Sequence, residues 1–266
     1  MGLFFAEDKR PQKGRLSGFD RYREILERDV MSFFLAGLVT LAGFLPFGAG
    51  VFCAVATSSV LVLIPACVLG GLFAGPALYA LLDLIFRTLR DAPVNWWENY
   101  RAAIRKNWRQ ALLPGVVLCL YLGFAVFAGM LFWWAEQMPS AGTIALFLAS
   151  LLLGTMLLGT YWPQLVLFQQ SGVQRLRNCV LFCVKYFWHT LRSAAILVAF
   201  WVLVALLLPW SLAVIPLIGM WYFPFLANLL LYNDLNEAFR IEEQIWAAFP
   251  EQRPVYDDEE RFKEGG

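Results

Sequence analysis

Charged residues and histidine are scarce in this chain, and both shortages restrict what it can be. Asp, Glu, Lys and Arg make up 15% of the 266 residues, and 60% are hydrophobic. Soluble domains contain about 25% charged residues. A single soluble core of this size cannot hide so many apolar side chains from water. The composition therefore predicts a membrane protein.

The sequence also lacks the residue patterns on which common catalytic and metal sites depend. It contains no HExxH, Walker or GxSxG motif, and its single histidine is His189, next to Trp188. The five cysteines show no CxxC spacing and lie in or beside apolar segments, as buried thiols do. No apolar segment has a carboxylate near its middle, which an ion-driven pump would need. We therefore expect no enzyme activity, no metal or cofactor, and no nucleic-acid partner.

Long apolar segments are what the chain does have. No charged residue occurs from Met31 to Leu82, and one bilayer crossing takes about 20 apolar residues, so this run predicts two crossings. We place the turn between them at Ala56–Ser59. The alternative turn, Pro46–Gly50, would leave a short first span, so Pro46 is interpreted as a kink within it. Span two then covers about residues 60–86, and four more follow at about 111–134, 143–168, 190–208 and 212–232.

The predicted fold class is all-α: a polytopic membrane protein with six transmembrane helices and amphipathic helices on the cytoplasmic face. Residues 1–30 form an N-terminal segment whose amphipathic helix covers Phe19–Val30. Residues 31–232 form the transmembrane domain, and we expect kinks at Pro216 and Pro224 in the last span. Residues 233–266 form a second amphipathic helix followed by an acidic tail.

The lysines and arginines predict the orientation. All of them lie in the N-terminal segment, between spans two and three, from the end of span four to the start of span five, or in the C-terminal tail. With six spans these four regions share one side, and the opposite loops carry no cation and one acid, Glu136. Lysine and arginine are retained on the cytoplasmic side. We therefore predict a multi-pass protein of the plasma membrane with both termini in the cytoplasm.

The two inter-span segments on the basic side combine cations with aromatic residues. In the first, aromatic or apolar residues recur every fourth position from Trp96, and arginines line the neighbouring helix face. Tryptophan favours the headgroup zone and arginine can pair with lipid phosphate, so these segments are either anchors in the lipid bilayer or docking surfaces for a partner. The candidate docking residues are Trp96, Trp97, Tyr100, Arg101, Arg105, Trp108, Arg109, Arg175, Arg177, Lys185 and Trp188.

Few polar residues lie within the predicted spans. Gln164 and Asn228 could line a path through the membrane or form hydrogen bonds between helices. Gly75 and Pro76 predict either close helix packing or a hinge in span two. A small-molecule facilitator with its own central path is therefore the alternative to a docking protein.

A run of features around Gly75-Pro76-Ala77 resembles the YesL-type family of bacterial membrane proteins of unknown function. An apolar helix, an arginine, a basic aromatic helix and Asn107-Trp108 follow it before the next span. The pattern covers about residues 71–123, with a weaker continuation to about 196. Members of that family are often encoded beside carbohydrate-uptake ABC transporters and polysaccharide-degrading enzymes. The resemblance implies an accessory or regulatory role in carbohydrate uptake, with an ABC-type carbohydrate transporter or another membrane protein as partner.

Overall fold

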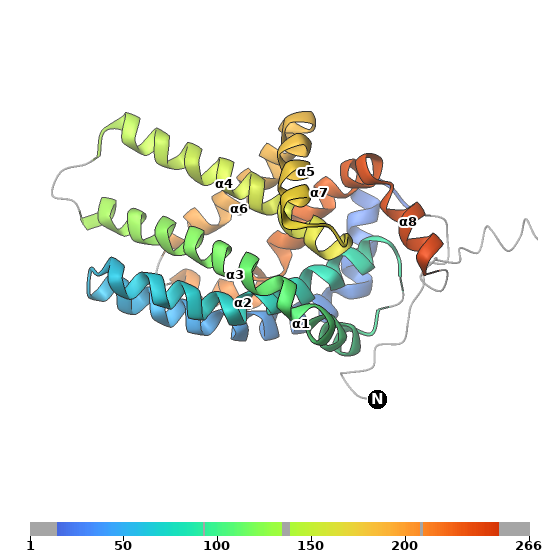
Figure 1. Ribbon diagram of the computed structural model, residues 1–266, viewed down its shortest axis with the longest axis horizontal. Coiled ribbons are helices and arrows are strands. Elements are labelled where there is room, and N and C mark those ends of the chain that lie inside the picture. The colour runs from blue at the N-terminus through green and yellow to red at the C-terminus, as the bar shows by residue number, and fades with distance from the viewer. Residues whose placement is uncertain (1–14, 93, 135–138, 208–209, 250–266) are drawn as a thin grey trace, which may run out of the picture.

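The computed structural model describes residues 15–92, 94–134, 139–207 and 210–249 (Figure 1). Within these ranges the chain forms helices and no strand. The predicted acidic tail beyond Pro250 lies outside the described residues, as does Glu136. The elements are α1 (Gly18–Ala56), α2 (Val60–Leu89), α3 (Trp96–Trp134), α4 (Ala141–Leu167), α5 (Gly172–Lys185), α6 (Phe187–Leu206), the 3-10 turn η1 (Trp210–Ala213), the π-helical turn η2 (Ile215–Gly219), α7 (Tyr222–Phe239) and α8 (Ile241–Ala248).

Six helical segments are long and apolar enough to cross a membrane, which confirms the predicted fold class. They are α1, α2, α3, α4, α6 and the stretch Ile215–Phe239 that joins η2 to α7. In Figure 1, α1, α2 and α3 run side by side, with α4 and α6 on their other flank, and α5 lies across the direction of these helices. The architecture is that of a multi-pass membrane protein.

The first two spans meet where the polar residues predicted a turn. α1 ends at Ala56, and the backbone N–H of Ser59 donates to the carbonyl of Ala54. Ser58 has a φ of 48°, in the left-handed region that a tight turn uses. Pro46 lies inside α1, so the alternative turn at residues 46–50 is wrong.

The sequence predicted separate surface helices before spans one and three. In the structure each amphipathic segment is continuous with the span that follows it. α1 and α3 each run for 39 residues without interruption. At 1.5 Å per residue such a helix is about 58 Å long, well beyond the roughly 30 Å hydrocarbon core of a bilayer. The backbone stays helical across each junction, in α3 also through Pro114, so each helix continues from the amphipathic part into the apolar part.

The last span differs from the prediction at both ends. η1 and η2 precede α7, so Pro216 lies in a π-helical turn, and Pro224 lies in the first turn of α7. Proline lacks the N–H that continues α-helical bonding, which accounts for the irregular backbone around Pro216. α7 continues to Phe239 rather than ending at Tyr232, and α8 follows after Arg240 in the left-handed conformation.

Glycines bring α2 and α3 into close contact. A Cβ atom on Gly75 would lie against the carbonyl oxygen of Ala111, and one on Gly115 against the carbonyl oxygen of Gly71. Small residues four positions apart permit this approach of two membrane helices. α2 remains helical through Pro76. Gly75 therefore lies at a helix–helix contact. Of its two predicted roles, packing and a hinge, this contact supports packing.

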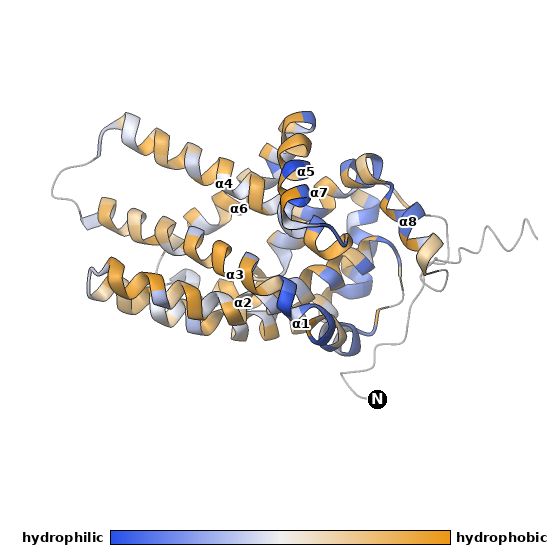
Figure 2. Ribbon diagram, viewed as in Figure 1, coloured by the Kyte–Doolittle hydropathy of each residue, from blue (hydrophilic) through white to orange (hydrophobic). Residues whose placement is uncertain are grey.

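Hydrophilic residues gather at one end of the bundle (Figure 2). We call this the charged end: α1 and α3 begin there, α2 ends there, and α5 and α8 lie there. The opposite ends of α1 and α2 carry no charged residue around their turn. This sorting agrees with the pattern on which the predicted orientation rests.

Candidate functional site

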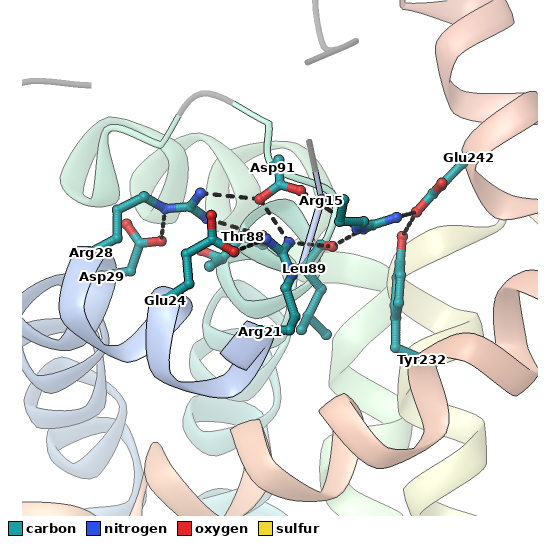
Figure 3. A network of polar contacts seen from close by, with 10 residues as sticks. All are labelled: Arg15, Arg21, Glu24, Arg28, Asp29, Thr88, Leu89, Asp91, Tyr232 and Glu242. Carbon is teal, nitrogen blue, oxygen red and sulfur yellow. Dashed lines mark hydrogen bonds and ion pairs between the residues drawn. The ribbon is translucent and has the colours of Figure 1, made fainter. Parts of the chain in front are cut away.

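Asp91 is the centre of an ionic network at the charged end (Figure 3). It lies just after α2 with a φ of 57°, a conformation that Asp tolerates better than most residues. The N–H of Asp91 donates to the Thr88 carbonyl and that of Ala92 to the Arg87 carbonyl, which ends the helix. The Asp91 side chain is wholly buried, with 0% of its surface exposed. A carboxylate in such a position requires cationic partners.

Three arginines from the N-terminal part of the chain surround this carboxylate. Arg21 Nη2 lies 2.7 Å and Arg28 Nη1 3.0 Å from Asp91 Oδ1, and Arg15 Nε lies 3.6 Å from Oδ2. Arg21 and Arg28 are seven residues apart, so they share one face of α1. The same arginines also donate to the Leu89 and Thr88 carbonyls at the end of α2. The network thus fixes the start of α1 to the end of α2.

The C-terminal helices join the network through Glu242. Arg15 Nη1 lies 2.5 Å from Glu242 Oε1, and the Tyr232 hydroxyl donates to the same oxygen at 2.5 Å. Burial lowers the pKa of Arg15, but its hydrogen bond to Glu242 and the attraction of Tyr232 and Glu242 more than offset this, so the pKa is raised. Arg15 therefore stays charged, and three distant segments of the chain meet at one cluster.

Sequence reasoning missed this cluster, because it used these cations only to assign an orientation. The seven-residue spacing of Arg21 and Arg28 on one helix face was a usable signal. Nothing in the sequence identified Asp91 or Glu242 as their partners.

The N-terminal part of α3 displays the basic aromatic surface that the sequence predicted. Its exposed cations form no ion pair within the described part of the chain, and the guanidinium of Arg109 lies 5.3 Å from the centre of the Trp108 ring. A shallow depression of about 490 Å³ is lined by Glu98, Ala102 and three of these cations. We call this the α3 surface; its exposed residues include Trp97, Glu98, Arg101, Ala102, Arg105, Lys106, Trp108 and Arg109.

Two candidate docking residues on α3 are not on that surface. Trp96 and Tyr100 are buried, with 5% and 1% of their surface exposed. The Tyr100 hydroxyl lies 3.0 Å from Thr40 Oγ1 and donates to the Ala77 carbonyl at 3.2 Å, so it joins α3 to α1 and α2. The predicted aromatic face therefore splits: its first two residues pack inside the bundle, and they cannot contact a docked partner.

The second basic segment is divided in the same way. Arg175 is buried, donates to the Tyr161 hydroxyl and the Gln170 carbonyl, and holds the start of α5 against α4. Arg177, Lys185 and Trp188 are exposed, and Lys185 Nζ lies 3.9 Å from Glu237 Oε1. Three of the four predicted docking residues of this segment are therefore exposed, and Arg175 is buried.

The predicted intramembrane polar residues do not contact each other. Gln164 is fully buried and donates from Nε2 to Cys179 Sγ at 3.3 Å, which links α4 to α5. Burial raises the pKa of the Cys179 thiol to about 12, so this sulfur is a neutral partner. Asn228 donates to the Pro224 carbonyl within its own helix. For Gln164, the contact between helices is the interpretation that the structure supports.

His189 has one acidic partner at the charged end. Its Nδ1 lies 2.8 Å from Asp234 Oδ2. The described residues contain no group of three or more His, Cys, Asp or Glu side chains that could hold a metal ion. Comparison of the chain with models of known protein families, with curated proteins and with solved structures found no match.

Proposed function

We propose that the protein is a non-enzymatic accessory protein of the plasma membrane that docks on a membrane partner through the α3 surface. The observation that carries this proposal is the set of exposed α3 cations that form no ion pair with a described residue. At the same end, Arg21 and Arg28 are engaged in contacts within the chain. Arginine and tryptophan are enriched among the residues that dominate protein interfaces. An acidic face on a membrane protein is the complementary partner.

The position of the α3 surface favours a role beside a membrane protein. α3 continues from this surface directly into an apolar span, so a docked partner would be held next to the bilayer. Tyr100 fixes the same helix to α1 and α2, which makes the surface rigid. Preorganised surfaces bind with a smaller entropic cost. We further propose, from the family resemblance, that the partner is an ABC-type carbohydrate transporter and that the role is accessory or regulatory to carbohydrate uptake.

The orientation is part of this proposal: the charged end faces the cytoplasm. Thr57 is exposed in the turn at the opposite end, and Ala102 is exposed on the α3 surface. We expect an impermeant thiol reagent to label Thr57→Cys in intact cells and Ala102→Cys only after permeabilisation, with the unsubstituted chain as the baseline. Labelling of Ala102→Cys in intact cells would reject this orientation.

Docking is tested by placing a photoreactive residue at Ala102 and irradiating native membranes. We expect a crosslink to a subunit of a carbohydrate transporter, identified by mass spectrometry. Arg101→Gln with Arg105→Gln should abolish the crosslink. The matched control, Arg23→Gln with Arg240→Gln, removes two exposed arginines that pair with acids on their own helices and should preserve it. Crosslinks to lipid alone would show that α3 is only an anchor in the bilayer.

A further inference from the structure

Arg90 is a buried cation, and two of its guanidinium nitrogens form no hydrogen bond with a described residue. It is the residue at which α2 ends, and 4% of its surface is exposed. Its Nε and Nη1 atoms are buried and donate to no acceptor in the described part of the chain. A buried charge whose N–H groups are unsatisfied is strongly unfavourable. Arg90 therefore differs from Arg21 and Arg28, which end on carboxylates.

Two carboxylates that act electrostatically on Arg90, those of Asp83 and Glu242, are already held by other groups. Asp83 Oδ2 lies 2.8 Å from Arg87 Nε, and Glu242 Oε1 accepts from Arg15 and from Tyr232. Burial dominates at Arg90 and lowers its pKa, although nearby acids oppose this. The described part of the chain thus supplies Arg90 with a polar neighbourhood but with no acceptor for its Nε and Nη1.

Arg87 lies near Arg90 and is partly exposed to solvent. It precedes Arg90 by three residues, so the two lie on one face of α2, and 26% of the Arg87 side chain is exposed. Its Nε is engaged with Asp83, and neither of its other guanidinium nitrogens forms a hydrogen bond with a described residue. Two guanidinium groups with free donors on one helix face suit an anion that accepts several hydrogen bonds.

We propose that Arg90 and Arg87 form an anion-binding site at the charged end, between the end of α2 and α7–α8, which takes a phosphate group. Phosphate offers several acceptor oxygens and enough charge for both guanidinium groups. The group can belong to free phosphate, a small phosphorylated compound or a lipid headgroup. Tyr232 on α7 and Glu242 on α8 act electrostatically on Arg90, so a bound phosphate would affect how strongly the C-terminal helices are held. This site is independent of docking at the α3 surface.

The test follows the melting temperature of the detergent-purified full chain by tryptophan fluorescence. Inorganic phosphate is titrated at constant ionic strength, with chloride as the balancing anion. We expect the melting temperature to rise with phosphate concentration, because a ligand that binds the folded state stabilises it. Arg90→Gln should weaken phosphate binding about 30-fold or more, as loss of a buried charged partner does. Arg23→Gln removes an exposed arginine of α1 that pairs with Glu27, outside both proposed sites, and should leave the phosphate response unchanged.

Further variants keep the test decisive. If Arg90→Gln does not fold, Arg87→Gln should show the weakened phosphate response instead, since the Arg87 side chain is partly exposed. Nanodiscs that contain phosphatidylglycerol, compared with phosphatidylcholine alone, identify the source: an Arg90-dependent rise only with phosphatidylglycerol assigns the site to a lipid headgroup. The proposal is wrong if neither phosphate nor phosphatidylglycerol raises the melting temperature. It is also wrong if Arg90→Met raises that temperature equally in every buffer, because Arg90 would then be an unoccupied buried charge.

Discussion

Neutralising Asp91 should loosen the connection between α1, α2 and the C-terminal helices. Asp91→Asn retains the side-chain shape and the tolerance for a φ of 57°, so it removes the charge and little else. The two closest cations, Arg21 and Arg28, have only 8% and 14% of their side chains exposed. After the substitution they would remain largely buried beside a neutral amide, and solvent could not replace the lost carboxylate.

The magnitude follows from what these arginines retain. Removing one partner of a buried ion pair costs about 3–5 kcal/mol, because an uncompensated charge stays buried. Arg21 still has Glu24 at 2.8 Å, and Arg28 still has Asp29 at 2.7 Å, so we expect the lower end, about 3 kcal/mol. The measurement is the free energy of unfolding in mixed detergent micelles.

Asp20→Asn is the matched control. Asp20 is exposed on the first turn of α1, and its substitution should change the free energy of unfolding by less than about 0.5 kcal/mol. The double variant Asp91→Asn with Arg28→Gln should lose less than the sum of the single losses, since both remove the same contact. If Asp91→Asn stays within about 1 kcal/mol of the unsubstituted protein, the network does not stabilise the fold as argued.

Two further predictions concern residues within the spans, with the same unfolding measurement. Gly75→Ala should destabilise the protein by about 1–3 kcal/mol or more, because its Cβ would meet the Ala111 backbone. The control Gly159→Ala should be neutral or slightly stabilising, because a Cβ there has nothing within 4 Å. Equal effects of the two substitutions would refute the close contact. Gln164→Met should leave stability unchanged or raise it, since Gln164 Oε1 is buried without a described partner; a large loss would show that the Gln164–Cys179 contact matters more than its geometry suggests.

The number and limits of the spans could be predicted because they follow from the transfer of side chains out of water. Met31–Leu82 is too long for one crossing, and its small polar residues at 57–59 can end a helix, so the turn lies there. The charged end was predictable for the same reason. The continuity of α1 and α3 was not, since amphipathic and apolar segments can join with or without a break.

The partners of individual side chains depended on rotations about the helix axes, which no local pattern records. Four-residue spacing placed Trp96, Tyr100 and Trp108 on one face, but only the first two are buried. The glycine contact that holds α2 against α3 determines how far each residue reaches into the bundle.

Hydropathy and charge along the chain determined depth in the membrane and which end carries the cations, because both are one-dimensional properties of the sequence. Only the tertiary structure decided which cations form ion pairs within the chain. Arg21 and Arg28 do, whereas Arg90 and Arg101 form none with a described residue. The reason is that an ion pair requires two groups within about 4 Å. That distance is set by the packing of segments that lie far apart in the chain.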